Sequence, residues 1–356
     1  MPGAAQYMPS EDTLENDSGV DLKICQCSGC GLVQLSNDPV PYYKEVIRAT
    51  SFSKEITDFR RKQFKTFIKD YNLENKKILE IGCGTGHYLS IMDELDVDAS
   101  GIEFSAASVE LCKNNGLSVE ESYIEKRSQK LDHGPFDAFF IMSFLEHVPH
   151  PKKILGGIYN NLNDGAVGLV EVPNFDMILK KNLFAEFISD HLFYFTKDTL
   201  KLVLQLNGFD IVDCEEVWYN YILSAVVKKR VSFDLSHFRE HKEKIRKEIT
   251  NYIDGFPEKS VTLWGAGHQA LAIMSMAELG GKVKYVVDSA TFKQGRFTPV
   301  THLPIVGPDR LDSDPPIAVI VMTASYSDEV VNIIRKDYSP DIKISILRDF
   351  GLEKIS

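Results

Sequence analysis

The chain has 356 residues, of which 44% are hydrophobic and 26% are charged, and its formal net charge is −11 at pH 7. This length allows two domains and a small third module, and the composition is ordinary for a globular protein. The negative charge argues against a nucleic-acid backbone as the main partner, because that partner needs a basic surface. No apolar run reaches the roughly 18–20 residues of a membrane span, and no secretory signal pattern is present at the N-terminus. We therefore expect a cytoplasmic protein that binds neither nucleic acid nor membrane.

Six cysteines in a chain of this kind do not indicate a disulfide framework. Cys27 and Cys30 have the Cys-x-x-Cys spacing of half a tetrahedral zinc site, and Cys25 offers a third thiolate. The sequence contains no second such pair. Two interpretations stay open, namely a zinc site that takes its fourth ligand from elsewhere and reduced thiols beside a turn. The remaining cysteines are expected in the core: Cys83, Cys112 and Cys214.

Three segments precede the first predicted α/β domain. Residues 1–20 are polar, acidic and without periodicity, so we expect them to be extended or poorly ordered. A short strand is expected over 31–35. Residues 51–72 carry apolar side chains such as Phe59 and Phe67 at helical spacing, which predicts a helix that leads into the first strand of that domain.

The most informative stretch reads Lys-Ile-Leu-Glu-Ile-Gly-Cys-Gly-Thr-Gly. A short apolar strand is followed by Gly82, Gly84 and Gly86, and glycine lets a ligand lie against the backbone where a strand turns into a helix. The dinucleotide pattern GxGxxG needs its third glycine at position 87, which is His87. Together with Glu80 the spacing is instead E-x-G-x-G-x-G.

A second acid follows about one βαβ unit downstream. A strand is expected over 97–102 and ends at Glu103, where a carboxylate can accept hydrogen bonds from both ribose hydroxyls of a nucleoside. The whole constellation resembles the S-adenosylmethionine (SAM) site of class I methyltransferases. That resemblance implies a cofactor site formed by the two acids, the three glycines, Phe104 and Ser143.

The rest of this predicted domain alternates helices and strands. The apolar run 136–142 is typical of a buried strand, and residues 211–217 and 221–227 are expected to pair as antiparallel strands. The other expected elements are helices over 106–115, 154–162 and 200–206, and strands over 117–119 and 166–172.

A second α/β pattern follows a charged segment. Residues 234–254 are spaced for one apolar face, which predicts a connecting helix with a solvated charged side. Strands are then expected over 261–264, 284–287 and 318–322, and the first of them meets another glycine turn. That turn lacks a third glycine, so we favour a scaffolding or substrate-covering role for this half over independent cofactor binding.

Three further stretches make the resemblance more specific: 27–35 (Cys-Ser-Gly-Cys-Gly-Leu-Val-Gln-Leu), 190–195 (Asp-His-Leu-Phe-Tyr-Phe) and 293–305 (beginning Lys-Gln-Gly-Arg-Phe-Thr-Pro). With the glycine motif, they resemble the C-methyltransferases that act on nucleotide-linked keto-deoxysugars. The resemblance implies an α/β fold in which a cysteine segment precedes a Rossmann-like SAM domain and a second Rossmann-like domain. The implied boundaries are 1–50 for the cysteine segment, 51–230 for the SAM domain, 231–258 for the connecting helix and 259–356 for the C-terminal domain.

The chain departs from that family at two places. The family's zinc module carries two Cys-x-x-Cys pairs, and only the second is present here. The family's catalytic loop usually reads Tyr-His-Glu-His, whereas this chain has Ile-Ser-Asp-His at 188–191. The histidine that resembles the general base is kept as His191, which puts the exact substrate in doubt more than the reaction class.

The resemblance also implies roles for the side chains around this loop. His191 is the expected base for forming an enolate, because the pKa of histidine lies near the working pH. Asp190 is expected to hold its tautomer or to face the sugar, and Tyr194 to donate to the enolate oxygen. His147 is expected either to close over the cofactor or to take part in the chemistry. Asn174 is a candidate for binding a substrate hydroxyl or carbonyl.

Two other functions remain open at this point. The loop residue Ile188, which stands where the family has tyrosine, favours a small-molecule O- or N-methyltransferase on the same scaffold. A non-enzymatic protein that senses SAM or a nucleotide would use the glycine turn while His191 merely packs against its aromatic neighbours.

Overall fold

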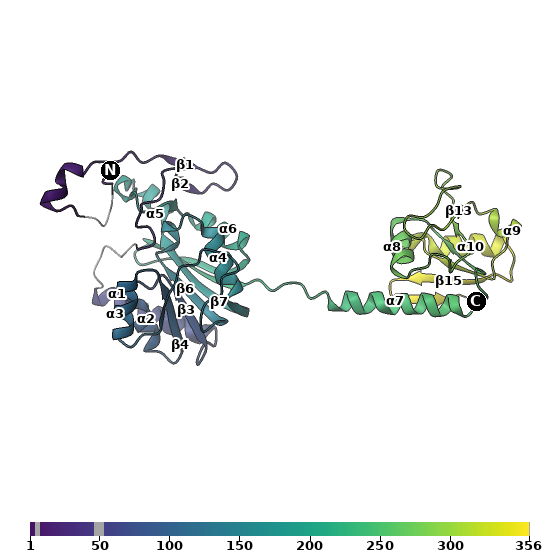
Figure 1. Cartoon of the computed structure of the whole chain (residues 1–356), viewed down its shortest axis with the longest axis horizontal. Coiled ribbons are helices and arrows are strands. Elements are labelled where there is room, and N and C mark those ends of the chain that lie inside the picture. Colours follow the sequence, from purple (N-terminus) through teal and green to yellow (C-terminus); the bar gives the residue numbers. More distant parts are fainter. Residues whose placement is uncertain (4–7, 46–52, 356) are drawn as a thin grey trace. The chain divides into compact units, whose positions relative to one another are not determined.

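The computed structural model describes residues 1–3, 8–45 and 53–355, and the chain divides into two compact units, Met1–Ser232 and Phe233–Ser356 (Figure 1). The expected boundary between the cysteine segment and the SAM domain, at residue 50, lies outside the described residues, as does the expected start of the helix at 51. Among the helices of the described ranges, none is long and apolar enough to cross a membrane.

The first unit is built on a seven-stranded sheet. All its strands are parallel except β10, which runs antiparallel to both β7 and β9. The spatial order is β5 (Val119–Glu121), β4 (Asp98–Glu103), β3 (Lys77–Ile81), β6 (Phe136–Met142), β7 (Leu162–Pro173), β10 (Ile222–Lys229) and β9 (Phe209–Val217). The first strand in the sequence therefore lies inside the sheet, with β4 on one side and β6 on the other.

Helices cover both faces of this sheet. One face packs against α4 (Pro151–Asn160) and α6 (Lys197–Leu206), and the other against α1 (Lys54–Asp70), α2 (His87–Asp93) and α3 (Ala106–Asn114). The central strand β6 shows why: Phe139 and Ile141 belong to the first core and Phe140 and Met142 to the second. A strand buried on both faces reads as a continuous apolar run, as the sequence did.

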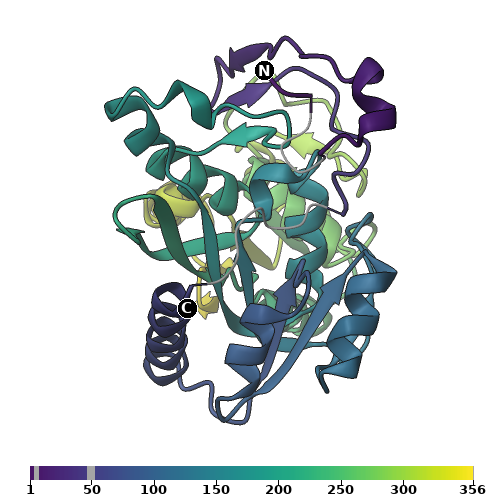
Figure 2. The same cartoon turned by 90° about the vertical axis from the view of Figure 1, so that its left-hand side faces the viewer.

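A small three-stranded sheet joins the N-terminal segment to the rest of this unit (Figure 2). The hairpin β1 (Ile24–Gln26) and β2 (Val33–Leu35) pairs through β2 with β8 (Phe193–Tyr194), which the sequence did not predict. The expectation of an extended N-terminus is wrong for one stretch, since η1 (Glu11–Asn16) is a 3-10 helix with a capping box at Ser10. Thr13 completes that box, so local side-chain bonds replace the missing apolar periodicity.

The connections near the end of β7 were also not predicted. The short helix α5 (Phe175–Lys180) begins directly after β7 and is followed by the 3-10 turn η3 (Phe184–Glu186). Another 3-10 turn, η2 (Leu145–His147), follows β6. These pieces are too short to show a helical period, and two of them carry candidate site residues.

The second unit holds a six-stranded sheet in which only β16 is antiparallel to its neighbour. Its order is β13 (Ile305–Val306), β12 (Val286–Val287), β11 (Val261–Trp264), β14 (Ala318–Val321), β15 (Lys343–Arg348) and β16 (Gly351–Lys354). Its other elements are α8 (His268–Met276), α9 (Arg310–Ser313), η4 (Ala324–Tyr326) and α10 (Ser327–Asp337). A second Rossmann-like domain is therefore confirmed.

The helix α7 (Ser236–Asp254) forms where the charged segment predicted it, but it is part of the second unit rather than a separate connector. Ile245, Ile249 and Ile253 are buried in the core of that unit. Phe238, which lies on the same predicted face, is 63% exposed. The amphipathic pattern thus describes only the second half of the helix, which has a sheet to pack against.

Candidate active site

The glycine turn lies at the carboxyl end of β3, the edge where open α/β sheets bind ligands. Gly82, Gly84 and Gly86 all have positive φ, at 68°, 54° and 80°. A Cβ at Gly82 would approach the ring of Phe144 to 2.7 Å, so this glycine is required by packing. No heavy atom lies within 4 Å of the position that a Cβ would take at Gly84. The turn is therefore closed by its neighbours at one glycine and open to a ligand at another.

Glu103 holds this turn in place. Its Oε2 accepts a hydrogen bond from the backbone N–H of Gly84 at 2.9 Å, and its Oε1 accepts one from the N–H of Ser105, also at 2.9 Å. The side chain of Ser105 caps α3, as predicted. An ionised carboxylate has about four lone-pair sites, so these two bonds leave capacity for ribose hydroxyls. Sequence analysis placed this acid beside the cofactor but missed its bond to the glycine turn.

We expect Glu103→Ala to weaken SAM binding by roughly 1.5–3 kcal/mol, because the acceptor for two charge-assisted bonds is lost and the glycine turn loses its support. Isothermal titration with SAM measures the effect, and Glu103→Gln is the matched control that keeps the size of the side chain. If Glu103→Ala bound SAM as the wild type does, the ribose acid would lie elsewhere.

We expect Gly84→Val to abolish SAM binding, since the side chain would fill the open space above the turn and a β-branched residue is strained at a φ of 54°. Thermal unfolding of the variant checks that the sheet still forms. A folded variant that kept its affinity for SAM would show that the ligand does not lie against this glycine.

A narrow pocket continues from the turn along β4. It is lined by Gly82, Glu103, Phe104 and Tyr123, among others. The ammonium group of Lys44 lies 5.0 Å from the ring centroid of Phe104 and 4.9 Å from that of Tyr123. Two aromatic rings around one group form a slot suited to a planar base as well as to a cation.

Two other predicted cofactor residues lie at the same edge. Ser143, which follows β6, has a φ of 52°, and its N–H donates to the carbonyl of Glu171 in β7 at 2.9 Å. Glu80 lies within β3 and is only 2% exposed. Its register partners are Gly101 in β4 and Phe140 in β6, so its side chain lies in the middle of the sheet.

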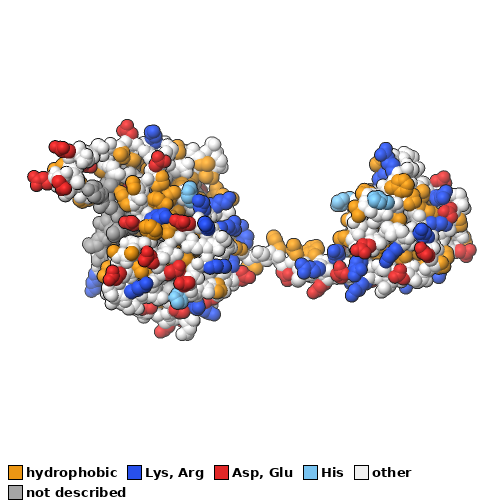
Figure 3. Space-filling view, in the orientation of Figure 1, with side chains coloured by type: hydrophobic (Ala, Val, Ile, Leu, Met, Phe, Trp, Pro, Cys, Tyr) orange, Lys and Arg blue, Asp and Glu red, His pale blue; other side chains and the backbone are white. Residues whose placement is uncertain are grey.

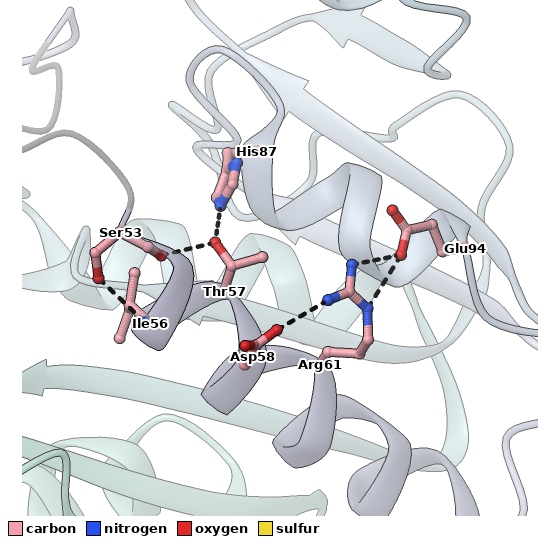
Figure 4. Close-up of polar contacts among 7 residues, drawn as sticks. All are labelled: Ser53, Ile56, Thr57, Asp58, Arg61, His87 and Glu94. Atoms are coloured by element: carbon pink, nitrogen blue, oxygen red, sulfur yellow. Dashed lines mark hydrogen bonds and ion pairs between the residues drawn. The ribbon is translucent and has the colours of Figure 1, made fainter.

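The helix after the glycine turn is fixed to α1 (Figure 4). His87, the first residue of α2, is 3.2 Å from the hydroxyl of Thr57, and that hydroxyl donates to the carbonyl of Ser53 at 3.0 Å. One turn further along, Arg61 bonds Glu94 through two nitrogens at 2.8 and 3.2 Å. The residue that breaks the dinucleotide pattern thus joins the glycine turn to the preceding helix.

A buried charged network below Ser143 was missed by sequence analysis. Arg60 and Glu171 form an ion pair at 2.5 Å, with side chains 1% and 0% exposed. Gln63 donates to Glu171 and accepts from Arg60. The guanidinium also lies 5.1 Å from the ring centroid of Tyr88 in α2. An acid inside an otherwise apolar strand was the signal, because a buried carboxylate needs a cation beside it.

Three side chains with lone pairs come together where η2 meets the loop before β8. One ligand-type atom from each of Glu146, His147 and His191 lies within 4.8 Å of the other two. His147 Nδ1 donates to the carbonyl of Asp190 at 2.8 Å, so its Nε2 carries the lone pair, 3.8 Å from Glu146 Oε1. The rings of the two histidines meet edge to face with centroids 4.7 Å apart.

Burial keeps both imidazoles neutral. It lowers the pKa of His147, and together with the neighbouring His147 it lowers the pKa of His191 to about 3. At neutral pH each ring therefore offers a lone pair. His147 is buried and His191 is partly exposed, so a substrate can reach only the second ring directly. The same three side chains have the composition of a divalent metal site, and a cation there would occupy the lone pair of His191.

Asp190 and Tyr194 are placed differently from the expectation. The group of Asp190 that orients an imidazole is its main-chain carbonyl, and the imidazole is that of His147. Its carboxylate accepts from the hydroxyl of Tyr42 at 2.8 Å. The hydroxyl of Tyr194 donates to the carbonyl of Ile188 and accepts from the N–H of the same residue. Both side chains thus hold the loop that presents His191.

Asn174 has a structural role that the sequence did not predict. It is the N-cap of α5: its Oδ1 accepts from the N–H groups of Asp176 and Met177, and its Nδ2 donates to the carbonyl of Asn220. The residue is fully buried. The expectation that it binds substrate is therefore corrected, because capping has taken both ends of its amide.

The cysteine segment lies at the edge of this site. Leu35 of β2 donates to the carbonyl of Leu192, next to His191, at 3.0 Å. Backbone N–H groups of Cys30 and Gly29 lower the pKa of Cys27. Within the described residues, the three candidate thiols do not form a converging group of ligands, and Cys25 is exposed on β1. Cys83, Cys112 and Cys214 are buried, as predicted.

Sheet order, glycine turn and Glu103 together define a class I SAM-dependent methyltransferase. Comparison with protein families supports this: residues 53–213 match the methyltransferase domain family, and residues 230–341 match the C-methyltransferase C-terminal domain. The chain is thus a SAM-dependent methyltransferase that carries the C-terminal domain of C-methyltransferases.

Similar proteins include one that matches along most of the chain. C-methyltransferase NovU of Streptomyces niveus is 19% identical over 93% of this chain and 87% of its own length. A ubiquinone biosynthesis O-methyltransferase of Thiobacillus denitrificans is 31% identical, but over 23% of this chain and 38% of its own length. Among solved structures, a SAM-dependent methyltransferase from Clostridium acetobutylicum has a TM-score of 0.41 at 14% identity, and it covers 53% of this chain and 96% of that one.

Proposed function

We propose that this protein transfers the methyl group of SAM to a carbon atom next to the carbonyl of a nucleotide-linked keto sugar. The observation that carries the proposal is the pairing of the glycine turn with a neutral, partly exposed His191 in a single unit. The C-terminal domain match and the similarity to NovU support carbon as the methylated atom.

The proton transfer is assigned to His191. Its lone pair takes the proton from the carbon beside the carbonyl, and the electron pair of the broken C–H bond moves onto the carbonyl oxygen as an enolate. The enolate carbon then forms a bond to the methyl carbon as the bond from that carbon to sulfur breaks. SAM supplies the methyl group and leaves as S-adenosylhomocysteine, so atoms and electrons balance.

Glu146 and His147 support this step from behind the ring. His191 becomes an imidazolium when it takes the proton, and a buried cation needs a nearby negative charge. The Glu146 carboxylate is within 4.8 Å of both histidines and is itself only 1% exposed. Sequence analysis gave Glu146 no role, because its importance depends on the fold of η2 against the 188–191 loop.

The direct test is incubation with SAM and a panel of nucleotide-linked keto sugars, followed by mass spectrometry for a product heavier by one methylene group. Fragmentation then locates the new methyl group. Transfer to oxygen or nitrogen alone would favour the O- or N-methyltransferase hypothesis. Tight SAM binding without transfer to any acceptor would favour the sensor.

We also propose that zinc, where bound, uses Cys27 and Cys30, and that its role is to stabilise the hairpin behind the His191 loop. Because only three cysteines are available, we expect less than one equivalent per chain, or a ligand from a second chain. Elemental analysis of the purified protein measures this ratio. A stoichiometric zinc that resists chelation in the monomer would contradict the expectation.

Chelation also separates the base from a metal mechanism at His191. We expect a protein treated with a chelator to keep its methyltransferase activity, because the proton transfer needs the free lone pair of His191. Circular dichroism checks that the cysteine hairpin survives the treatment. Activity that disappears on chelation and returns with a divalent cation would make Glu146, His147 and His191 a metal site instead.

A further inference from the structure

An open cavity of about 590 Å³ adjoins the cofactor pocket. The two share Tyr123, Ile124 and Ile154 in their walls, so they form one continuous depression. The volume is in the range of sites that bind small ligands. Neither the glycine turn nor the histidines account for this cavity.

Basic side chains are concentrated around it. Lys126 and Arg127 lie on the segment after β5, and Lys152 and Lys153 lie in the first turn of α4; all but Lys152 line the cavity, and Lys152 lines the depression next to it. No ion pair involves these four among the described parts of the chain. On the face shown in Figure 3, acidic and basic side chains are interspersed over the first unit. Four cations at one hollow therefore stand out in a chain with a net charge of −11.

The arrangement is built by close packing. A Cβ at Gly157 in α4 would lie 2.3 Å from Ile124, and one at Gly156 would lie 3.1 Å from Cγ of Arg127. Asn160 in the same helix donates to the carbonyl of Arg127 at 2.8 Å. Two adjacent glycines thus let the 124–127 segment lie directly on α4 and bring the two pairs of cations to the same cavity.

The remaining walls suit the rest of a nucleotide. Tyr43 lines the cavity and meets the ring of Tyr123 edge to face, with centroids 6.2 Å apart, so an aromatic face is available for a base. Glu125, the acid among the described lining residues, is already paired with Lys44 at 2.7 Å. The N-terminus of α4 adds its own positive potential.

We infer that this cavity binds the nucleoside diphosphate part of the acceptor, with the diphosphate on the four cations and the base against Tyr43. The inference rests on the proposed function, because it supplies the place for the nucleotide of the keto sugar. His147 lies three residues before His150, which lines the cavity, so one loop connects the cavity to the proposed base. The second unit is not needed for this site.

The test uses the full chain and isothermal titration with uridine diphosphate, thymidine diphosphate and inorganic pyrophosphate. We expect the nucleoside diphosphates to bind and their affinity to fall as salt rises. Lys126→Glu with Lys153→Glu should weaken that binding at least about tenfold, because two attractive charges become repulsive. Binding of pyrophosphate as tight as that of the nucleotides would leave the cation site and remove the base site at Tyr43.

The matched control is Lys65→Glu with Lys113→Glu, which changes the net charge equally at exposed positions on α1 and α3. This variant should keep the wild-type affinity to within about twofold. SAM affinity measured on both variants checks that the cofactor pocket is intact. Equal losses in the two double variants, or no diphosphate binding by the wild type, would overturn the inference.

Kinetics separates this inference from the proposed function. With a keto-sugar nucleotide that is methylated, the Lys126→Glu and Lys153→Glu variant should raise KM and leave kcat nearly unchanged. Methylation with an unchanged KM would refute the cavity and leave the proposed function standing. Diphosphate binding that follows the cations, with no keto sugar methylated, would refute the proposed function alone.

Discussion

Replacing His191 with asparagine is expected to lower kcat by about 10²–10⁴, the usual contribution of a general base. SAM affinity should stay nearly unchanged, because the cofactor is held by the glycine turn and Glu103 in another part of the sheet edge. Single-turnover kinetics and titration with SAM measure the two effects separately.

Exchange of the substrate's hydrogen with deuterated solvent tests the proton step itself. With S-adenosylhomocysteine in place of SAM, the wild type should exchange the hydrogen beside the carbonyl, and His191→Asn should not. Asp190→Asn should lose less activity, since the main-chain carbonyl that orients His147 is kept in that variant. If His191→Asn transferred methyl groups at the wild-type rate, the base would have to be moved to His147.

Removal of Arg60 is expected to cause the largest loss of stability. Arg60→Ala leaves the Glu171 carboxylate buried without its cation, which typically costs about 3–5 kcal/mol of the free energy of unfolding. Denaturant unfolding monitored by circular dichroism gives the value. The carbonyl of Glu171 also accepts from Ser143, so SAM affinity should fall together with stability.

Two controls show that the burial of the charge matters. Arg61→Ala removes an exposed ion pair with Glu94 one residue further along α1, and it should change the stability little. Arg60→Met combined with Glu171→Met should lose less than Arg60→Ala, because no unpaired charge is left. An unfolding midpoint for Arg60→Ala that equalled that of Arg61→Ala would contradict a role for this pair.

Much of the fold was predictable because its signals are local. The buried strand β6 is a run of apolar residues, and the glycine turn, Glu103 and the cap at Ser105 follow one another in the sequence. The antiparallel pair β9 and β10 also formed as predicted. Each of these depends on neighbours within a few residues or on burial of a whole strand.

The candidate site was less predictable, because its contacts join distant parts of the chain. Asn174 looked like a substrate ligand at a strand end, but a short helix that has no visible period begins at that point and takes its amide. The partner of Glu171 lies on α1, more than a hundred residues earlier in the sequence. Glu146 gains its place only when η2 packs against the His191 loop. No local pattern encodes such contacts.

The central claim is that the methyl group goes from SAM to a carbon through an enolate formed by this protein. Nuclear magnetic resonance of the product made with SAM carrying a ¹³C-labelled methyl group tests it most directly. We predict a carbon–carbon coupling between the labelled methyl and the sugar carbon beside the carbonyl when a ¹³C-labelled sugar nucleotide is used. A labelled methyl group attached to oxygen or nitrogen, with no such coupling, would contradict the account.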